Sequence, residues 1–241
     1  MLTITENSSV AEIVSYNIET IDVFKKYEID FCCGGDVSLR KICDEKGLMY
    51  KELQWALQNI SQLKNKVYDY VSWDVNFLMD HIVHIHHAYV TANIEKIQQY
   101  ANKVANVHGI HYPELLEIKS LFREVSEALV THMKEEEQVL FPYIKHLVAV
   151  QKQKEALVTT GFEAIENPIQ LMEAAHENAG NLFKRISALA KNYTPPNTAC
   201  TTLKAFYTAL QEFEEDLHLH IHLENNILHP KALKLEEQMA K

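Results

Sequence analysis

The stretch HMKEEEQVLFP at residues 132–142 is repeated as HIHLENNILHP at residues 220–230. In both copies the glutamate is the fourth residue after the first histidine, and the proline is the tenth residue after that histidine. Residues i and i+4 lie on one face of an α-helix, so each copy directs an imidazole and a carboxylate the same way. The repeat therefore predicts two helices that each carry a His-Glu pair suited to metal binding, His132 with Glu136 and His220 with Glu224.

Two further histidines extend this pattern along the chain. The four histidines follow one another at intervals of 45, 44 and 44 residues, and they are His87, His132, His176 and His220. Such near-equal intervals are expected where successive antiparallel helices return to one level of a bundle. Spacing alone does not decide between His87 and its neighbours His84 and His86. We expect the other histidines near these helices, including His218 and His222, to support the ligands or to lie at the surface.

Hydrophobic periodicity predicts four long helices, over about 73–104, 113–150, 168–192 and 198–228. Gly109 and Pro113 mark the first gap, Gly161 and Pro168 the second, and the prolines at 195–196 the third. No alternating run of β-branched residues bounded by turn residues indicates a strand. The sequence therefore predicts an all-α fold, an up-down four-helix bundle.

A small helical domain is expected ahead of the bundle. Ser9 and Glu12 form a capping box for a first helix. A later helix should begin near Asp36 and end near Gly47, and another should run over about 50–63. All 13 histidines lie beyond residue 80, which supports a boundary between the two parts. We place the small domain at residues 1–66 and the bundle at residues 67–241.

Four histidines and two glutamates should thus converge inside the bundle. The two halves of the site are related by approximate two-fold symmetry, which favours two metal ions bridged by Glu136 and Glu224. Two divalent cations would also offset the cost of burying both carboxylates. Imidazole and carboxylate ligands suit iron, zinc, manganese or copper, so the residues alone leave the metal open.

A ferritin-like carboxylate site is the structural alternative. Its Glu-x-x-His element is matched by Glu173 with His176 and by Glu215 with His218. A single histidine on an apolar helix is most often a core or surface residue. We favour the paired His-Glu site because the ferritin-like arrangement leaves the repeat unexplained.

Composition restricts the partners and the compartment. The 23 basic and 33 acidic residues give a net charge of −10, which disfavours nucleic acid and anionic membranes as partners. The first residues do not resemble a signal peptide, and no apolar run is long enough to span a membrane, so we expect a cytoplasmic protein. The four cysteines are too few and too scattered for a disulfide framework, and we expect Cys43 and Cys200 to be buried thiols.

The motifs together resemble one family. KYEIDFCCGG at residues 26–35, MEAAHENAG at residues 172–180 and the two repeat copies are similar to those of hemerythrin-like iron-sulfur cluster repair proteins, the Repair of Iron Centres family. The resemblance covers nearly the whole chain. In the family the first helix supplies one ligand, and matching Asp80 and the apolar spacing after it to the family's pattern places this ligand at His87. His229 departs from the repeat, since the first copy has Phe141 at that position.

The resemblance implies a non-haem di-iron centre and a repair function. Its two irons would be bridged by an oxo or hydroxo group and by Glu136 and Glu224, and its protein ligands would be His87, His132, Glu136, His176, His220 and Glu224. The implied role is restoration of iron-sulfur clusters damaged by nitric oxide or oxidants. Our leading hypothesis is that the protein does so by supplying iron. Damaged iron-sulfur proteins would be its partners, and nitric oxide or oxygen its small ligands.

Other functions stay open at this point. The same metals could reduce nitric oxide, or the protein could bind or sense oxygen or nitric oxide. Oxygen-carrying hemerythrins have a His-x3-His element, for which His218 and His222 are the candidates here. The sequence leaves open whether the protein is an enzyme, which client and reductant it uses, and whether it forms a homodimer.

The adjacent cysteines Cys32 and Cys33 are candidates for thiol-mediated transfer of iron or nitric oxide. They precede Gly34-Gly35 and an expected helix start, so nearby backbone N–H groups favour a thiolate with a lowered pKa, although Asp36 opposes this. The alternative is a buried pair that fills a small core. Ala179 and Gly180 follow His176 by three and four residues, and their small size should leave space beside the metals.

Overall fold

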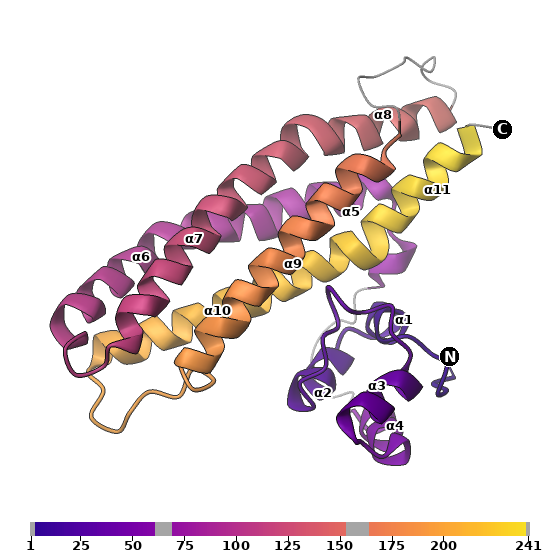
Figure 1. The fold of residues 1–241 in the computed structure, drawn as a ribbon. Helices are drawn as coiled ribbons and strands as arrows, with labels where there is room; N and C mark the ends of the chain where they lie inside the picture. Colours follow the sequence, from indigo (N-terminus) through magenta and orange to yellow (C-terminus); the bar gives the residue numbers. More distant parts are fainter. Residues whose placement is uncertain (1–2, 61–68, 153–163, 240–241) are drawn as a thin grey trace.

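The computed structural model describes residues 3–60, 69–152 and 164–239, and these ranges form helices and loops without a β-strand. Four long helical arms lie alongside one another in an up-down bundle, with the amino-terminal helices against one side (Figure 1). The predicted all-α class and four-helix bundle are confirmed.

Each arm of the bundle contains one or more consecutive helices. The first is α5 (Val75–His81), the π-helical turn η2 (Ile82–His87) and α6 (Ala88–His108), preceded by the 3₁₀ turn η1 (Tyr70–Ser72). The second is α7 (Glu114–Glu135), η3 (Glu136–Leu140) and α8 (Phe141–Gln151). The third is α9 (Glu166–Leu189), and the fourth is α10 (Thr201–Leu223), η4 (Glu224–Leu228) and α11 (His229–Met239). The fourth arm therefore continues through α11 to Met239, beyond its predicted end at residue 228.

The π-helical turns were not expected from the sequence. η3 and η4 begin at the repeated glutamates Glu136 and Glu224, and each is followed two residues later by a proline, Pro142 or Pro230. A proline inside an α-helix has no N–H for the preceding turn and its ring collides with the carbonyl four residues earlier. The wider π turn accommodates the proline, so the arm continues without a break. Such turns are frequent at functional sites.

Two apolar clusters fill the bundle. One contains Phe122, Phe183 and Phe213, whose rings lie 5.4 to 6.4 Å apart between centroids. The other is built around residues such as Ile82 and Leu228, closer to the carboxyl end of the fourth arm. The first cluster continues into the amino-terminal segment, where it includes buried residues such as Phe24. The polar residues of the predicted site lie along the arms between the two clusters.

The amino-terminal segment has four short helices, α1 (Val10–Tyr16), α2 (Thr20–Lys26), α3 (Leu39–Lys46) and α4 (Tyr50–Gln58). Ser9 caps α1 as predicted, because its side chain accepts a hydrogen bond from the Glu12 N–H. Gly47 ends α3 with a φ of 66°, as expected for a glycine cap. The boundary predicted at residues 66–67 and the end of the helix predicted over 50–63 lie outside the described residues.

The start predicted for the third helix was wrong. Ser38, not Asp36, caps α3, because the backbone before Ser38 pairs with the start of α1. The Ala11 N–H donates to the Gly35 carbonyl at 2.8 Å, and the Val10 N–H donates to the Val37 carbonyl at 3.2 Å. A Cβ atom on Gly35 would lie 2.9 Å from both the Ala11 Cβ and the Phe31 carbonyl oxygen, so the close approach requires glycine.

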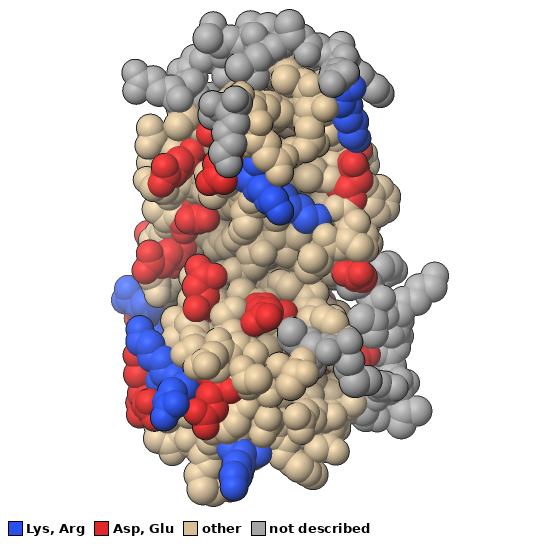
Figure 2. Space-filling model, turned by 90° about the vertical axis from the view of Figure 1, so that its right-hand side faces the viewer, with Lys and Arg blue, Asp and Glu red and all other residues tan. Residues whose placement is uncertain are grey.

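The surface and the helices add two observations on partners. On the face shown in Figure 2, acidic side chains are spread along the molecule and basic side chains form small separate groups, which is not the broad basic surface that binds phosphates. Among the helices that the structure describes, none combines the length and apolarity that crossing a membrane requires.

Candidate metal centre

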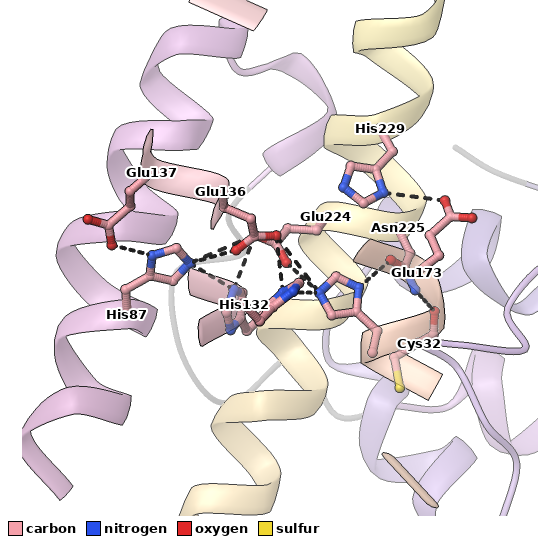
Figure 3. Close-up of polar contacts among 11 residues, drawn as sticks. Cys32, His87, His132, Glu136, Glu137, Glu173, Glu224, Asn225 and His229 are labelled. Atoms are coloured by element: carbon pink, nitrogen blue, oxygen red, sulfur yellow. Dashed lines mark hydrogen bonds and ion pairs between the residues drawn. The ribbon is translucent and has the colours of Figure 1, made fainter. Parts of the chain in front are cut away.

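The structure brings the six predicted ligand residues together at one level of the bundle (Figure 3). His87 ends η2, His132 lies in α7, His176 in α9 and His220 in α10, while the glutamates begin η3 and η4. Glu136 and Glu224 are completely buried, and none of the four imidazoles is more than 4% exposed. This degree of burial is unusual for charged groups that lack a strong compensating charge.

The six residues form two sets of four ligand atoms. One set contains His87 and His220, the other contains His132 and His176, and both glutamates belong to each set. Glu136 places one oxygen 3.4 Å from His87 Nε2 and the other 3.1 Å from His132 Nε2. Glu224 does the same, with one oxygen 3.1 Å from His220 Nε2 and the other 3.1 Å from His176 Nε2. Each carboxylate thus divides its two oxygens between the two sets.

The spacing of the donor atoms fits two cations. The Nε2 atoms of His87 and His220 are 3.2 Å apart, and those of His132 and His176 are 2.8 Å apart. Two donors bound at right angles to one ion, each at about 2.1 Å, would lie about 3.0 Å apart. All four carboxylate oxygens are buried and have no properly oriented hydrogen-bond donor among the described residues. The donor set therefore suits a pair of metal ions, which would satisfy these oxygens.

Two side chains outside the sets orient the imidazoles. His87 Nδ1–H donates to Glu137 at 2.8 Å, and His176 Nδ1–H donates to Asn225 Oδ1 at 2.7 Å. A proton on Nδ1 leaves the Nε2 lone pair of the neutral ring directed at the centre. Glu137 and Asn225 each directly follow a repeated glutamate. The repeat therefore places both residues at the same offset, although the spacing of the ligands did not predict that they contact the imidazoles.

Charges within the metal-free centre balance through the histidines. Burial opposes protonation of His87, but contacts with Glu136, Glu224 and Glu137 outweigh it and raise its pKa to about 9. Burial likewise opposes protonation of His176, and Glu224 and Glu136 raise its pKa to about 9. Burial and Glu224 disfavour the charged form of Glu136, but His132 and His87 outweigh them and lower its pKa to about 2. Two imidazolium groups thus face two carboxylates at neutral pH.

The departure from the repeat is explained by ring stacking. Phe141 stacks on His87 with centroids 5.9 Å apart, and His229, at the equivalent position, stacks on His176 at 6.2 Å. His229 is completely buried, and its Nδ1 lies 3.3 Å from a carboxylate oxygen of Glu173. The end of the fourth arm is therefore more polar than that of the second.

The remaining histidines separate into surface and buried groups. His84 is exposed and bonds to the Asp80 carbonyl oxygen, whereas His86 is buried, bonds to Asp216 and stacks on His220 with centroids 5.7 Å apart. His218 and His222 contact the ring of Phe31. The His-x3-His pair therefore faces the amino-terminal segment and not the centre.

The ferritin-like arrangement does not form. Glu173 pairs with His229, and Glu215 is exposed and lies 3.7 Å from Lys25 Nζ. Neither of these glutamates belongs to a set of metal-ligating atoms at the centre.

The expectation of a lowered thiol pKa was wrong for Cys32. Asp30 accepts hydrogen bonds from the N–H groups of Cys32 and Cys33 at 2.9 and 3.0 Å, so these donors are not directed at a thiolate. Contact with Cys33, burial and the negative charge of Asp30 raise the pKa of Cys32 well above its usual value. Gly180 lies next to the cysteine loop, since a Cβ atom there would meet Cys33 Sγ at an ordinary contact distance of 3.7 Å.

The other two cysteines differ from one another. Cys43 is buried as expected, whereas Cys200 is exposed, which corrects the prediction. Cys200 directly precedes α10, and its sulfur lies 3.2 Å from His108 Nε2. All four cysteines are free thiols.

The chain is similar to known proteins over most of its length. Residues 78–232 match the hemerythrin HHE cation binding domain, and residues 6–61 match ScdA_N, a domain of unknown function. A probable iron-sulfur cluster repair protein of Haemophilus influenzae is 34% identical over 88% of this chain and 90% of its own length. The iron-sulfur cluster repair protein YtfE of Escherichia coli O157:H7 is 33% identical over 88% of this chain and 90% of its own length. The iron-sulfur cluster repair protein ScdA of Staphylococcus haemolyticus is 29% identical over 95% of this chain and 99% of its own.

We predict that the metal-free protein releases about two protons when it binds two divalent cations at pH 7. His87 and His176 each have a pKa of about 9, so both are protonated at pH 7, and a metal ion binds only the deprotonated imidazole. The count should fall as the pH rises through 9, and the apparent affinity should increase over the same range. Calorimetric Mn²⁺ titrations in buffers of different ionisation enthalpy measure the protons, because Mn²⁺ favours imidazole and carboxylate ligands over thiols. Binding without proton release at pH 7 would contradict the charge balance.

Proposed function

Since the chain belongs to the hemerythrin HHE cation-binding family, we propose that it holds two iron ions and supplies iron to damaged iron-sulfur clusters. The observation that carries the proposal is the pair of four-atom sets that share Glu136 and Glu224. Imidazole and carboxylate donors are suited to iron, and the shared carboxylates suit two ions held side by side. The names of the relatives support cluster repair as the task. In the proposal, damaged iron-sulfur proteins are the partners, and nitric oxide or oxidants cause the damage.

In this proposal the residues of the centre retain and then release the cargo. The six ligands hold the ions, and Glu137 and Asn225 keep two imidazoles oriented toward them. When the ions leave, His87 and His176 each take up a proton, because both have a raised pKa in the metal-free chain. Proton uptake replaces the lost positive charge beside the glutamates. Release of iron is therefore compatible with a folded bundle.

The two ions would not be held equally. The Nδ1–H of His87 is bonded to a carboxylate, Glu137, whereas that of His176 is bonded to the neutral amide of Asn225. A carboxylate partner makes an imidazole a stronger ligand. The ion bound by His132 and His176 should therefore leave first.

The central experiment compares iron transfer with nitric oxide consumption. The ferrous full chain is incubated without oxygen with a dehydratase whose cluster was destroyed by nitric oxide, in the presence of a sulfide source. We expect reactivation of the dehydratase and transfer of labelled iron to it, with no catalytic consumption of nitric oxide in a parallel assay. Catalytic consumption without transfer of iron would instead establish the rival function, reduction of nitric oxide.

We predict that Glu136→Ala and Glu224→Ala each lose both irons. Each carboxylate contributes to both sets, so its removal affects both ions. His84→Ala is the matched control, because His84 is exposed, contacts the Asp80 carbonyl oxygen and should leave iron binding unchanged. Metal analysis after reconstitution should give about two irons per chain for the control and for the unaltered protein. Equal losses in the three variants would refute this ligand set.

We also predict that a strong chelator removes iron in two phases of equal amplitude. The fast phase reports the ion of His132 and His176, and the slow phase that of His87 and His220. Glu137→Gln should accelerate the slow phase by roughly 10-fold, because it replaces the carboxylate with an amide as at Asn225. The exposed neighbour Glu135 provides the control Glu135→Gln, which should leave both phases unchanged. A single phase in the unaltered protein would show that the two ions are held equally.

A further inference from the structure

We propose that Asp30, Cys32 and Cys33 form a third metal site, which binds one thiophilic divalent cation such as Zn²⁺, Co²⁺ or Fe²⁺. Binding of the cation does not depend on the function proposed above. The use of this site to receive iron that leaves the bundle does rest on that function.

The two distances from Cys32 Sγ to the other donors fit a tetrahedral ion, and the ligand atoms of all three residues lie within 4.8 Å of one another. The two sulfur atoms are 3.8 Å apart, and Cys32 Sγ lies 3.4 Å from Asp30 Oδ1. An ion with metal-sulfur distances of about 2.3 Å and a metal-oxygen distance of about 2.0 Å would hold two sulfurs about 3.8 Å apart and a sulfur and an oxygen about 3.5 Å apart. All three donors can therefore reach one ion with little movement.

The loop that carries the donors is held from two sides. Asp30 accepts the N–H groups of Cys32 and Cys33, which curls the backbone so that both sulfurs lie near its carboxylate. On the other side, the Asn226 amide of η4 donates to the Phe31 and Cys32 carbonyls at 3.2 and 3.3 Å. These contacts arrange the site before an ion binds, which reduces the entropic cost of binding.

Charge and exposure suit a site that binds and releases its ion. Binding of a divalent cation displaces the two thiol protons to solvent and forms two metal-sulfur bonds, with no change of oxidation state. Cys32 is buried, whereas Asp30 is exposed and Cys33 partly exposed. Three protein donors leave one tetrahedral position for water or for a ligand from another protein.

The site adjoins the half of the centre that should release its ion first. Gly180 lies one turn after His176 on α9, and a Cβ there would be 3.7 Å from Cys33 Sγ. Asn225 spans the remaining gap, because it accepts from His176 and donates to the Cys32 carbonyl at 3.4 Å (Figure 3). An ion that leaves His176 would therefore meet soft thiolate ligands next to its former site.

Cobalt provides a spectroscopic probe for this site. The full chain is first loaded with iron and kept reduced without oxygen, and Co²⁺ is then titrated. We expect about one equivalent of Co²⁺ to bind with a thiolate-to-cobalt charge-transfer band, while the iron content stays at about two per chain. Cys33→Ser and Asp30→Asn should each weaken Co²⁺ binding at least 10-fold.

Two features of the variants keep the test decisive. Asp30→Asn retains an oxygen that can accept both backbone N–H groups, so the loop fold should persist without the carboxylate charge. Cys200→Ser is the matched control, because it removes an exposed thiol beside His108 and should leave the band unchanged. Circular dichroism checks that each variant is folded.

Absence of the band in the iron-loaded protein would overturn the third site and leave the proposed function intact. An unchanged affinity in Asp30→Asn would overturn the three-donor assignment. Failure of the unaltered protein to hold two irons would instead refute the di-iron function, and a Co²⁺ band in that same sample would still support the third site.

Discussion

Burial of two carboxylates at one level of the bundle is the constraint on which the structure depends. Glu136 and Glu224 are fully buried, and an uncompensated buried charge costs several kcal/mol (about 3 to 5 when a partner is removed). Four imidazoles from four arms surround them, and the raised pKa values of His87 and His176 supply positive charge in the metal-free chain. The apolar clusters above and below exclude water from this layer, which strengthens every electrostatic interaction within it.

The internal repeat builds a nearly symmetric centre, and its few departures give the two halves different properties. Glu137 and Asn225 occupy the same offset, but one is an exposed carboxylate and the other an amide that contacts the amino-terminal loop. Phe141 and His229 likewise stack on equivalent imidazoles, one apolar and the other paired with Glu173. In the proposed di-iron centre, the symmetry would provide for two ions, and the asymmetry would allow one of them to be released separately.

Periodicity and spacing predicted the parts of this protein that depend on local geometry. Intervals of 44 and 45 residues placed four histidines at one level because antiparallel helices of similar length return to it. The π turns, the Ser38 cap and the raised pKa of Cys32 were not predicted, since each depends on a contact that sequence spacing does not encode. For Cys32 that contact is with Asp30, whose carboxylate accepts the backbone N–H groups that were expected to stabilise a thiolate.

Three consecutive residues of η4 connect the centre to the cysteine loop. Glu224 contributes an oxygen to each set, Asn225 orients His176, and Asn226 holds the carbonyls of the loop. Asn225 also donates to the Cys32 carbonyl, so displacement of the loop alters the environment of the amide that fixes this imidazole. In the first copy, Glu137 orients His87 from an exposed position, and its described contacts do not include the loop. In the proposed di-iron centre, the loop would therefore influence one ion through Asn225, and this ion is the one whose imidazole, His176, lacks a carboxylate partner at Nδ1.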